Sequence, residues 1–195
     1  MLMRTFSGKT VDPVDLQPAD IDIFDIAHHL ANICRYNGAG KFHYSVAQHS
    51  VLLAHAVPAI MNHGGLITDD MEADAISLAC LLHDSVEAYI SDIPTPLKVS
   101  LGILDVVSAL EEDVIEMIFS KYALDLSVYE RIKPYDTRIC ENEKDALFPG
   151  QERPPSSYPP LAGVVVLPWT PEYAEKQFLM TFKMLTTKGV NYHEH

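Results

Sequence analysis

The fold of this chain is organised around the stretch Ala75-Ile76-Ser77-Leu78-Ala79-Cys80-Leu81-Leu82-His83-Asp84. Its apolar part predicts a central helix that is buried nearly all round, over about Glu72 to Ile90. His83 and Asp84 end the apolar run, although strongly hydrated side chains lose free energy when they leave water. A metal ion is the commonest partner that offsets this loss, and the pair supplies one nitrogen and one oxygen ligand. The doublet therefore indicates chemistry as well as fold.

Two other predicted helices each carry one further candidate ligand. His49 follows the capping box Ser45-Val46-Ala47-Gln48 and shares a helix face with apolar residues. Asp136 shares a face with Ile139, Cys140 and Glu143. A single inward-facing histidine is compatible with a core imidazole bonded to a carbonyl group, but four such polar groups on three helices are not explained in that way. They predict one divalent metal site with the ligands His49, His83, Asp84 and Asp136.

Composition narrows the class of protein. The 195 residues predict one domain, with 48% hydrophobic and 21% charged residues, which is typical of a soluble globular protein. A formal net charge of -13 argues against nucleic acid as a partner, and an anionic small substrate would need a metal and local cations. The three cysteines are interpreted as buried reduced thiols. No apolar stretch reaches the ~18 residues of a membrane span and no signal peptide is recognised, so we expect a cytoplasmic protein without a membrane partner.

Helix and turn signals predict an all-α fold with a small N-terminal β element over residues 4–13. The expected helices cover about 21–36, 45–58 or a little beyond, 72–90, 101–122, a segment that starts at the capping box 127–130 and contains Pro134, and 170–189. The fourth helix is expected to bury Ile103, Val106, Val107, Leu110, Val114 and Met117. Prolines predict an extended segment at 92–98 and a loop at 149–160, followed by β-like residues 164–167. We expect a single domain over 1–195, with its core at about 20–148 and a C-terminal loop and helix at 149–189.

The order of the candidate ligands resembles the H…HD…D signature of the HD-domain metal-dependent phosphohydrolases. The words at 44–50 and 83–88 are also similar, and 92–98 resembles the segment after the HD motif in 5′-deoxynucleotidases. The resemblance covers roughly Arg4 to Leu147. It implies an all-α HD-domain helical bundle that activates water with a divalent metal ion (Zn, Co, Mn or Mg) to cleave a phosphate ester.

Within this superfamily, the words at 6–9, 25–30 and 34–38 are most similar to the DatZ family. These phage enzymes are dATP triphosphohydrolases that deplete dATP where diaminopurine replaces adenine in DNA. The resemblance implies hydrolysis of dATP to deoxyadenosine and triphosphate in the host cytoplasm, by a homo-oligomer such as a hexamer. Two alternatives stay open: a 5′-deoxynucleotidase acting on monophosphates, and a catalytically inert regulatory HD protein that binds a nucleotide.

Asp84 is a candidate catalytic residue as well as a metal ligand. Further residues are candidates for other roles in the site. Glu87 lies one helical turn beyond the doublet, where related nucleotidases use a glutamate for proton transfer or for a second metal ion. Asp92 is expected to orient water or to protonate the leaving oxygen. Arg35, Lys98 and Lys133 are expected to bind phosphate groups. Each also has a simpler interpretation as a solvated helix, loop or surface residue.

The remaining polar groups are interpreted as structural. His28, His29, His43, His55 and His63 are expected to be core or surface imidazoles, and the run Glu111-Glu112-Asp113 a solvated helix face. Neither a Walker A loop nor a G-x-G-x-x-G motif occurs, so neither a P-loop nor a dinucleotide-binding fold is indicated.

Overall fold

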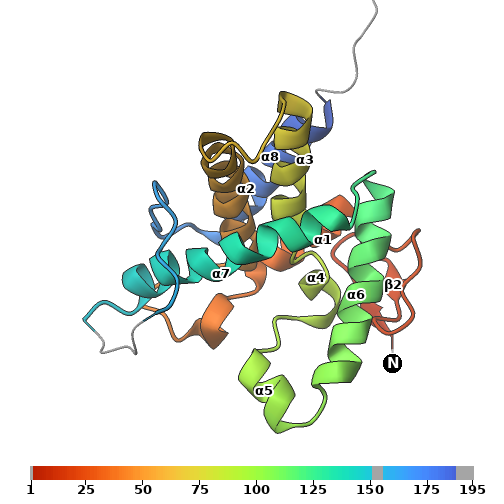
Figure 1. Cartoon of the computed structure of the whole chain (residues 1–195). Coiled ribbons are helices and arrows are strands. Elements are labelled where there is room, and N and C mark those ends of the chain that lie inside the picture. The colour runs from red at the N-terminus through yellow and green to blue at the C-terminus, as the bar shows by residue number, and fades with distance from the viewer. Residues whose placement is uncertain (1, 151–155, 188–195) are drawn as a thin grey trace, which may run out of the picture.

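The computed structural model describes residues 2–150 and 156–187, and within them the fold is all-α with a small N-terminal β element (Figure 1). The elements are β1 (Met3–Arg4), β2 (Thr10–Val11), α1 (Ile23–Asn32), the 3-10 turn η1 (Arg35–Gly38), α2 (Val46–His63), α3 (Asp70–Leu82), α4 (Glu87–Ile90), α5 (Thr95–Ser100), α6 (Leu104–Lys121), α7 (Ser127–Leu147) and α8 (Pro171–Thr187). The predicted fold class is confirmed.

The core lies between α2, α3 and α8, with α1 packed against α8. As predicted, α3 is the central helix, because every residue from Ile76 to Leu82 is buried. Helix α7 crosses α2 near its N-terminal end and α3 near its C-terminal end (Figure 1). This crossing brings the N-terminal end of α2 and the C-terminal end of α3 to the same face of α7.

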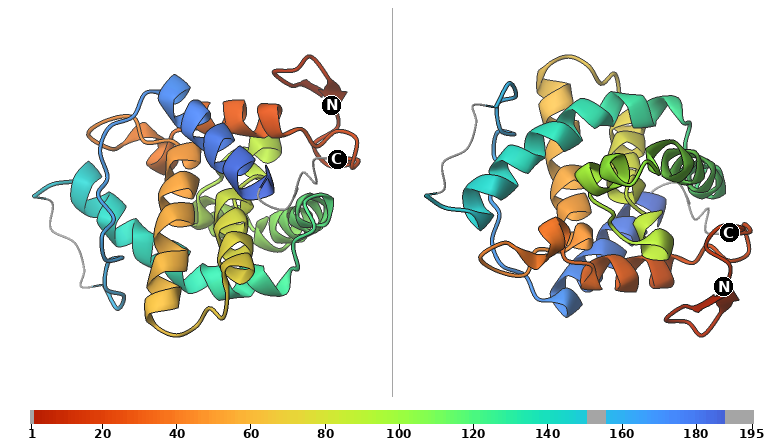
Figure 2. Two further views of the ribbon diagram at one scale, coloured as in Figure 1. Left: turned by 90° about the horizontal axis from the view of Figure 1, so that it is seen from above. Right: turned by 90° about the horizontal axis from the view of Figure 1, so that it is seen from below.

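The expected N-terminal β element is confirmed as a two-stranded antiparallel hairpin in which Met3 pairs with Val11. It projects from the helical body in both views of Figure 2. Ser7 at its tip holds it to α1, because the Ser7 backbone N–H and hydroxyl donate to the two carboxylate oxygens of buried Asp25 at 2.6 and 2.8 Å.

The predicted helix over 72–90 is wrong beyond Leu82. After this residue the chain forms hydrogen bonds between residues three apart, from Ser85 N–H to Leu82, from Glu87 N–H to Asp84 and from Ala88 N–H to Ser85. Such bonds wind the backbone more tightly than an α-helix does. The four-residue helix α4 then starts at Glu87. The HD doublet therefore lies in the turn that follows α3, and His83 is the C-cap of that helix.

The predicted helix over 21–36 also ends early, at Asn32. Ile33 and Cys34 are extended, and the Arg35 N–H donates to the Tyr44 carbonyl oxygen. Tyr36 and Asn37 then adopt left-handed backbone angles, with φ of 56° and 52°. Arg35 consequently lies on a tight turn rather than on a helix.

Three more local expectations are corrected. Segment 92–98 is not wholly extended, because α5 starts at Thr95 and Pro96 lies in its first turn, where a proline removes no helical hydrogen bond. The capping box at 127–130 is not formed; the carboxylate of Asp125 accepts the Ser127 N–H instead. Helix α7 continues through Pro134.

Further expectations fail around α6 and near the C-terminus. Helix α6 starts at Leu104, and Val106 from its expected inner stripe is 73% exposed, whereas Ile115, Ile118 and Phe119 are buried. Residues 164–167 form no strand, and Gly189, the expected end of the last helix, lies outside the described residues.

Cys80 is buried as predicted, Cys34 and Cys140 are half-buried, and all three thiols are free. Among the described residues, no helix combines the length and apolar character that crossing a membrane requires.

Candidate metal centre

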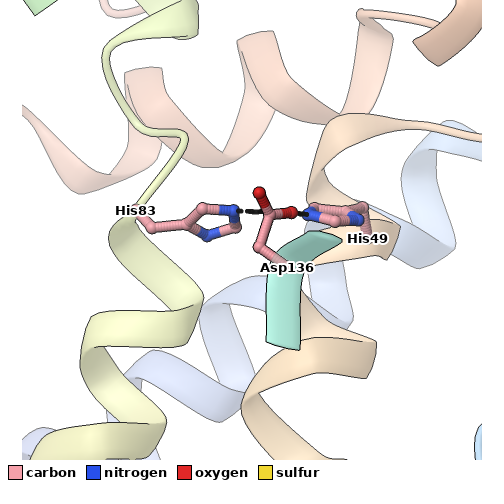
Figure 3. Close-up of side chains that lie close together, drawn as sticks. All are labelled: His49, His83 and Asp136. Atoms are coloured by element: carbon pink, nitrogen blue, oxygen red, sulfur yellow. Dashed lines mark hydrogen bonds and ion pairs between the residues drawn. The ribbon is translucent and has the colours of Figure 1, made fainter. Parts of the chain in front are cut away.

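Three predicted ligands converge where α7 crosses the other two helices. His49 comes from the first turn of α2, His83 from the end of α3 and Asp136 from α7, and both imidazoles point at the carboxylate (Figure 3). Asp136 Oδ1 lies 3.1 Å from His49 Nε2 and 3.6 Å from His83 Nε2, and the two Nε2 atoms are 3.3 Å apart. All three ligand atoms lie within 4.8 Å of one another.

These separations match the edges of a metal coordination polyhedron. Ligands about 2.0–2.1 Å from a divalent ion are about 3.3 Å apart in a tetrahedron and about 3.0 Å apart in an octahedron. Both histidines also have Nδ1 engaged elsewhere, His83 with the Cys80 carbonyl oxygen at 2.8 Å and His49 with a carboxylate of α7. Each Nε2 is thereby left facing Asp136. We call His49, His83 and Asp136 the metal group, and its geometry is compatible with a bound divalent metal ion.

Asp84, the fourth predicted ligand, lies beside this group. Its Oδ1 is 3.1 Å from His83 Nε2 and its Oδ2 is 3.5 Å from His49 Nε2. The same Oδ2 also lies 3.4 Å from Arg35 Nη1. The carboxylate is therefore close enough to join the three ligands but shares its charge with a guanidinium group.

Burial and neighbouring charges shift the pKa values of the site residues in opposite directions. Burial lowers the pKa of His83, but the charges and hydrogen bonds of Asp84 and Asp136 outweigh it and hold the pKa well above its usual value. Burial raises the pKa of Asp136, yet its bonds to His49 and His83 hold the pKa well below the usual value. Without a metal ion the site therefore favours protonated imidazoles beside ionised carboxylates, and a metal ion would displace those protons.

Glu143 is a further site residue, to which the sequence assigned a buried helix face but no role. Its Oε1 accepts from His49 Nδ1 at 2.5 Å and from the Tyr44 hydroxyl at 3.0 Å. Its Oε2 accepts from the Tyr36 hydroxyl at 2.6 Å and lies 3.4 Å from Arg35 Nη2. Burial raises its pKa, but Arg35 and His49 outweigh burial and lower the pKa to about 2. The only signal in the sequence is its position two helical turns after Asp136, on the same face.

A cavity of about 750 Å³ opens beside the metal group, between α4, α5, α6 and α7. His83, Asp84 and Asp136 line one part of its wall, and the predicted residues Glu87, Lys98 and Lys133 also line it. Lys98 Nζ is paired with Glu111 Oε1 at 2.5 Å, and Lys133 Nζ with Glu130 Oε1 at 2.7 Å. The structure thus brings the metal group and two of the three expected cations to one cavity.

Glu87 is a buried carboxyl group on this wall with a shifted pKa. Burial raises its pKa well above the usual value, and the charges of Asp84 and Asp92 add to the effect. Among the described residues its Oε2 has no hydrogen-bond partner. A raised pKa favours the protonated form of the carboxyl group, which is the form that can donate a proton.

The other two predicted residues do not line the cavity. Arg35 lies between Asp84 and Glu143, with its guanidinium group engaged by both carboxylates. Asp92 is half-buried before α5, and burial raises its pKa.

Four of the five histidines interpreted as structural have defined partners, and the fifth, His63, is exposed. His29, His43 and His55 bond to the Ala88 carbonyl, the Ala31 carbonyl and the Thr181 hydroxyl, whereas His28 pairs with the Glu175 carboxylate. The interpretation of the run 111–113 as a solvated face is wrong for Glu111, because this residue lines the cavity and holds Lys98.

Comparison with known proteins places the chain in a family. The fold and site define an all-α protein with a candidate metal centre of two histidines and an aspartate. No family model matches the chain. The Escherichia coli K12 protein described as "Uncharacterized protein YfdR" is 33% identical over 190 residues, which cover 94% of this chain and 95% of that protein. The chain therefore belongs to the YfdR family.

A second relative comes from Rhodobacter capsulatus and is described as "Uncharacterized protein RCAP_rcc00048". It is 40% identical over 105 residues, or 51% of this chain and 47% of that protein.

Proposed function

We propose that the protein is a metal-dependent nucleotide phosphohydrolase of the HD type, with dATP as its substrate and deoxyadenosine and triphosphate as its products. The observation that carries the proposal is the position of the metal group. Two imidazoles and one carboxylate meet in one group, and two of its members, His83 and Asp136, line a cavity whose wall also carries a glutamate and two lysines. The H…HD…D order of the ligands supports the same class of enzyme.

The side chains can be assigned roles in this reaction. A divalent ion held by His49, His83 and Asp136, with Asp84 beside them, would supply Lewis-acid activation of water and of a phosphate oxygen. Glu87 would donate a proton to the leaving 5′ oxygen, since its raised pKa favours the protonated carboxyl group. The alternative role of Glu87 is to hold a second ion.

Cations near the site would offset the charge of the phosphates. Lys98 and Lys133 line the cavity, and Arg35 lies behind Asp84. Seven carboxylates also line this cavity: Asp84, Glu87, Glu111, Glu112, Glu116, Glu130 and Asp136. A polyphosphate would therefore enter together with divalent cations, which compensate both the carboxylates and the phosphates.

The size of the cavity supports a nucleotide as the ligand. The cavity volume lies within the range of about 300–1,000 Å³ that small-molecule sites occupy, so a whole nucleotide is a reasonable ligand. The resemblance to DatZ favours adenine, a phage-infected host cytoplasm and a homo-oligomer such as a hexamer. A 5′-deoxynucleotidase would use the same metal group on a monophosphate.

The test is a product analysis with purified protein. It is incubated with dATP, dGTP, the diaminopurine deoxynucleoside triphosphate and dAMP, each with Mg²⁺, Mn²⁺, Co²⁺ or Zn²⁺. We expect deoxyadenosine and intact triphosphate from dATP, and no turnover by Asp84→Ala. Exposed Asp113 on α6 provides the matched control Asp113→Asn, which should retain activity. Preference for dAMP would favour the monophosphatase, and absence of metal-dependent turnover would favour an inert regulatory protein.

A further inference from the structure

We propose that Glu143 is a positioning residue that fixes which ring nitrogen His49 presents to a metal ion and anchors the Arg35 turn to the same site. The inference rests on the metal centre of the proposed function but not on its substrate or reaction. It assigns a role to a buried carboxylate that the proposed chemistry does not use.

The bond between Glu143 and His49 determines the state of the imidazole. An ionised carboxylate only accepts hydrogen bonds, so His49 Nδ1 carries the proton and donates it to Glu143 Oε1 at 2.5 Å. When a metal ion displaces the second proton of the imidazole, this N–H is the only one left, and the Nε2 lone pair is free to bind the ion. That Nε2 is the atom that lies 3.1 Å from Asp136 Oδ1 and 3.3 Å from His83 Nε2. Glu143 thereby directs the ligand atom of His49 into the metal group.

The surroundings of Glu143 keep it in place. Its side chain is fully buried, and a buried carboxylate is destabilising unless charged and polar partners surround it. Here His49, Tyr44, Tyr36 and Arg35 all face the two oxygens. Because three hydrogen bonds and one ion pair hold the carboxylate, it cannot turn away from His49 without losing several of them.

The same carboxylate also holds the turn that carries Arg35. Left-handed backbone angles in residues other than glycine are unfavourable unless the surroundings impose them, and Tyr36 and Asn37 both adopt them. The Tyr36 hydroxyl donates to Glu143 Oε2 at 2.6 Å, and the Tyr36 ring packs edge-on against Phe148. Glu143 therefore contacts both a metal ligand and the turn of the cation expected to bind phosphate.

The experiment compares metal affinity in two isosteric variants. Glu143→Gln keeps the shape of the side chain and removes its charge, whereas Glu141→Gln makes the same change at a carboxylate of α7 that pairs with Lys144. Zn²⁺ and Co²⁺ affinities are measured by competition with a chelator, with circular dichroism to verify folding. We expect Glu143→Gln to weaken binding about 10- to 100-fold, as loss of a hydrogen-bond partner of a ligand does, and Glu141→Gln to leave it unchanged. Equal affinities in folded Glu143→Gln and the original protein would overturn the proposal.

Two further measurements distinguish a role of Glu143 in metal binding from effects on folding and on catalytic activity. If Glu143→Gln does not fold, ¹⁵N NMR of the Zn²⁺-loaded original protein decides: a protonated Nδ1 and metal-bound Nε2 in His49 support the proposal, and metal-bound Nδ1 overturns it. Tyr36→Phe removes only the bond to the Arg35 turn, so it should leave metal affinity near that of the original protein. Lost metal affinity in Glu143→Gln without any nucleotide hydrolysis by the original protein would support the inference while contradicting the proposed function.

Discussion

Arg35 Nη1 lies 3.4 Å from Asp84 Oδ2, so a cation expected to bind phosphate is paired with a carboxylate expected to bind metal. Coordination of a metal ion would draw negative charge from the Asp84 carboxylate and weaken its attraction for Arg35. A metal ion that recruits Asp84 would release Arg35 for a phosphate group. This ion pair links the two halves of the proposed site.

The first prediction concerns Arg35→Ala. Removal of a charged hydrogen bond to phosphate is worth about 1.5–3 kcal/mol, so we expect KM for the nucleotide to rise about 10- to 100-fold. Metal affinity should not fall, since Asp84 loses a competing partner. Steady-state kinetics and a metal titration measure both quantities. An unchanged KM together with weakened metal binding would show that Arg35 serves the metal group alone.

Glu87→Gln tests the proposed proton donor. The amide cannot release a proton to the leaving oxygen, and we expect kcat to fall on the order of 100-fold, as for loss of a general acid. Folding should be largely unaffected, because the amide keeps the shape of the side chain and burial disfavours the charged form of Glu87, whose pKa is raised. Thermal unfolding measured beside the kinetics separates the two effects. A kcat close to that of the original protein would mean that another group handles the proton.

Metal binding should depend on pH in a defined direction. Burial lowers the pKa of His49, but Glu143 and Asp136 outweigh it, and His83 is raised in the same way, so both imidazoles keep protons above their usual value of 6.5. A metal ion must displace these protons, and its affinity should therefore increase as the pH rises through and above 6.5. Calorimetry in buffers of different ionisation enthalpy would count the protons released. Affinity that stays constant between pH 6 and 8 would contradict this assignment of ligands.

Removal of the metal ion by a chelator should lower the thermal stability of the protein, because an ion that binds only the folded state stabilises that state. An ion present at about 1,000 times its Kd stabilises the folded state by about 4 kcal/mol, a contribution that EDTA removes.

Self-association is predicted at the exposed apolar residues around the start of α6. Val99, Leu101 and Val106 are 58%, 61% and 73% exposed, and neighbouring exposed apolar side chains often form interfaces. We expect light scattering to give a mass above 21.7 kDa and the double variant Leu101→Glu/Val106→Glu to reduce it. Val14→Glu, at an apolar residue of the N-terminal loop that is 70% exposed, is the matched control. A mass near 21.7 kDa for the original protein would refute the prediction.

Sequence patterns predicted the parts of the fold that local signals encode. The Ser45 hydroxyl accepts the Gln48 N–H, so the predicted N-cap of α2 forms, but the Gln48 side chain bonds to the Leu167 carbonyl and does not return to Ser45 to complete the capping box. The continuous apolar run likewise identified α3 as the buried helix. The ends of α1 and α3 were wrong because residues on both sides have similar helix propensity, and bonds to distant segments decide where each helix stops. The Arg35 N–H, for example, bonds to Tyr44 across a turn.

Glu143 shows why part of the site was missed. The metal ligands follow the HD signature, but the role of Glu143 depends on Tyr36, Tyr44 and His49, which lie roughly a hundred residues earlier. No local spacing encodes such partners. Glu111 was missed in the same way, because α5 brings Lys98 to it only in the folded chain.

The end of α3 at Leu82 has an electrostatic consequence for the order of binding. Aligned peptide dipoles give a helix a partial negative charge at its C-terminus, which stabilises a nearby cation by about 0.3–1 kcal/mol and disfavours an anion. His83 caps that terminus, so the metal group lies in the negative end of the field of the central helix. A polyphosphate that arrives first meets repulsion, whereas one that follows a metal ion meets a compensated site. The backbone of α3 therefore favours metal before nucleotide, whatever side chain occupies position 84.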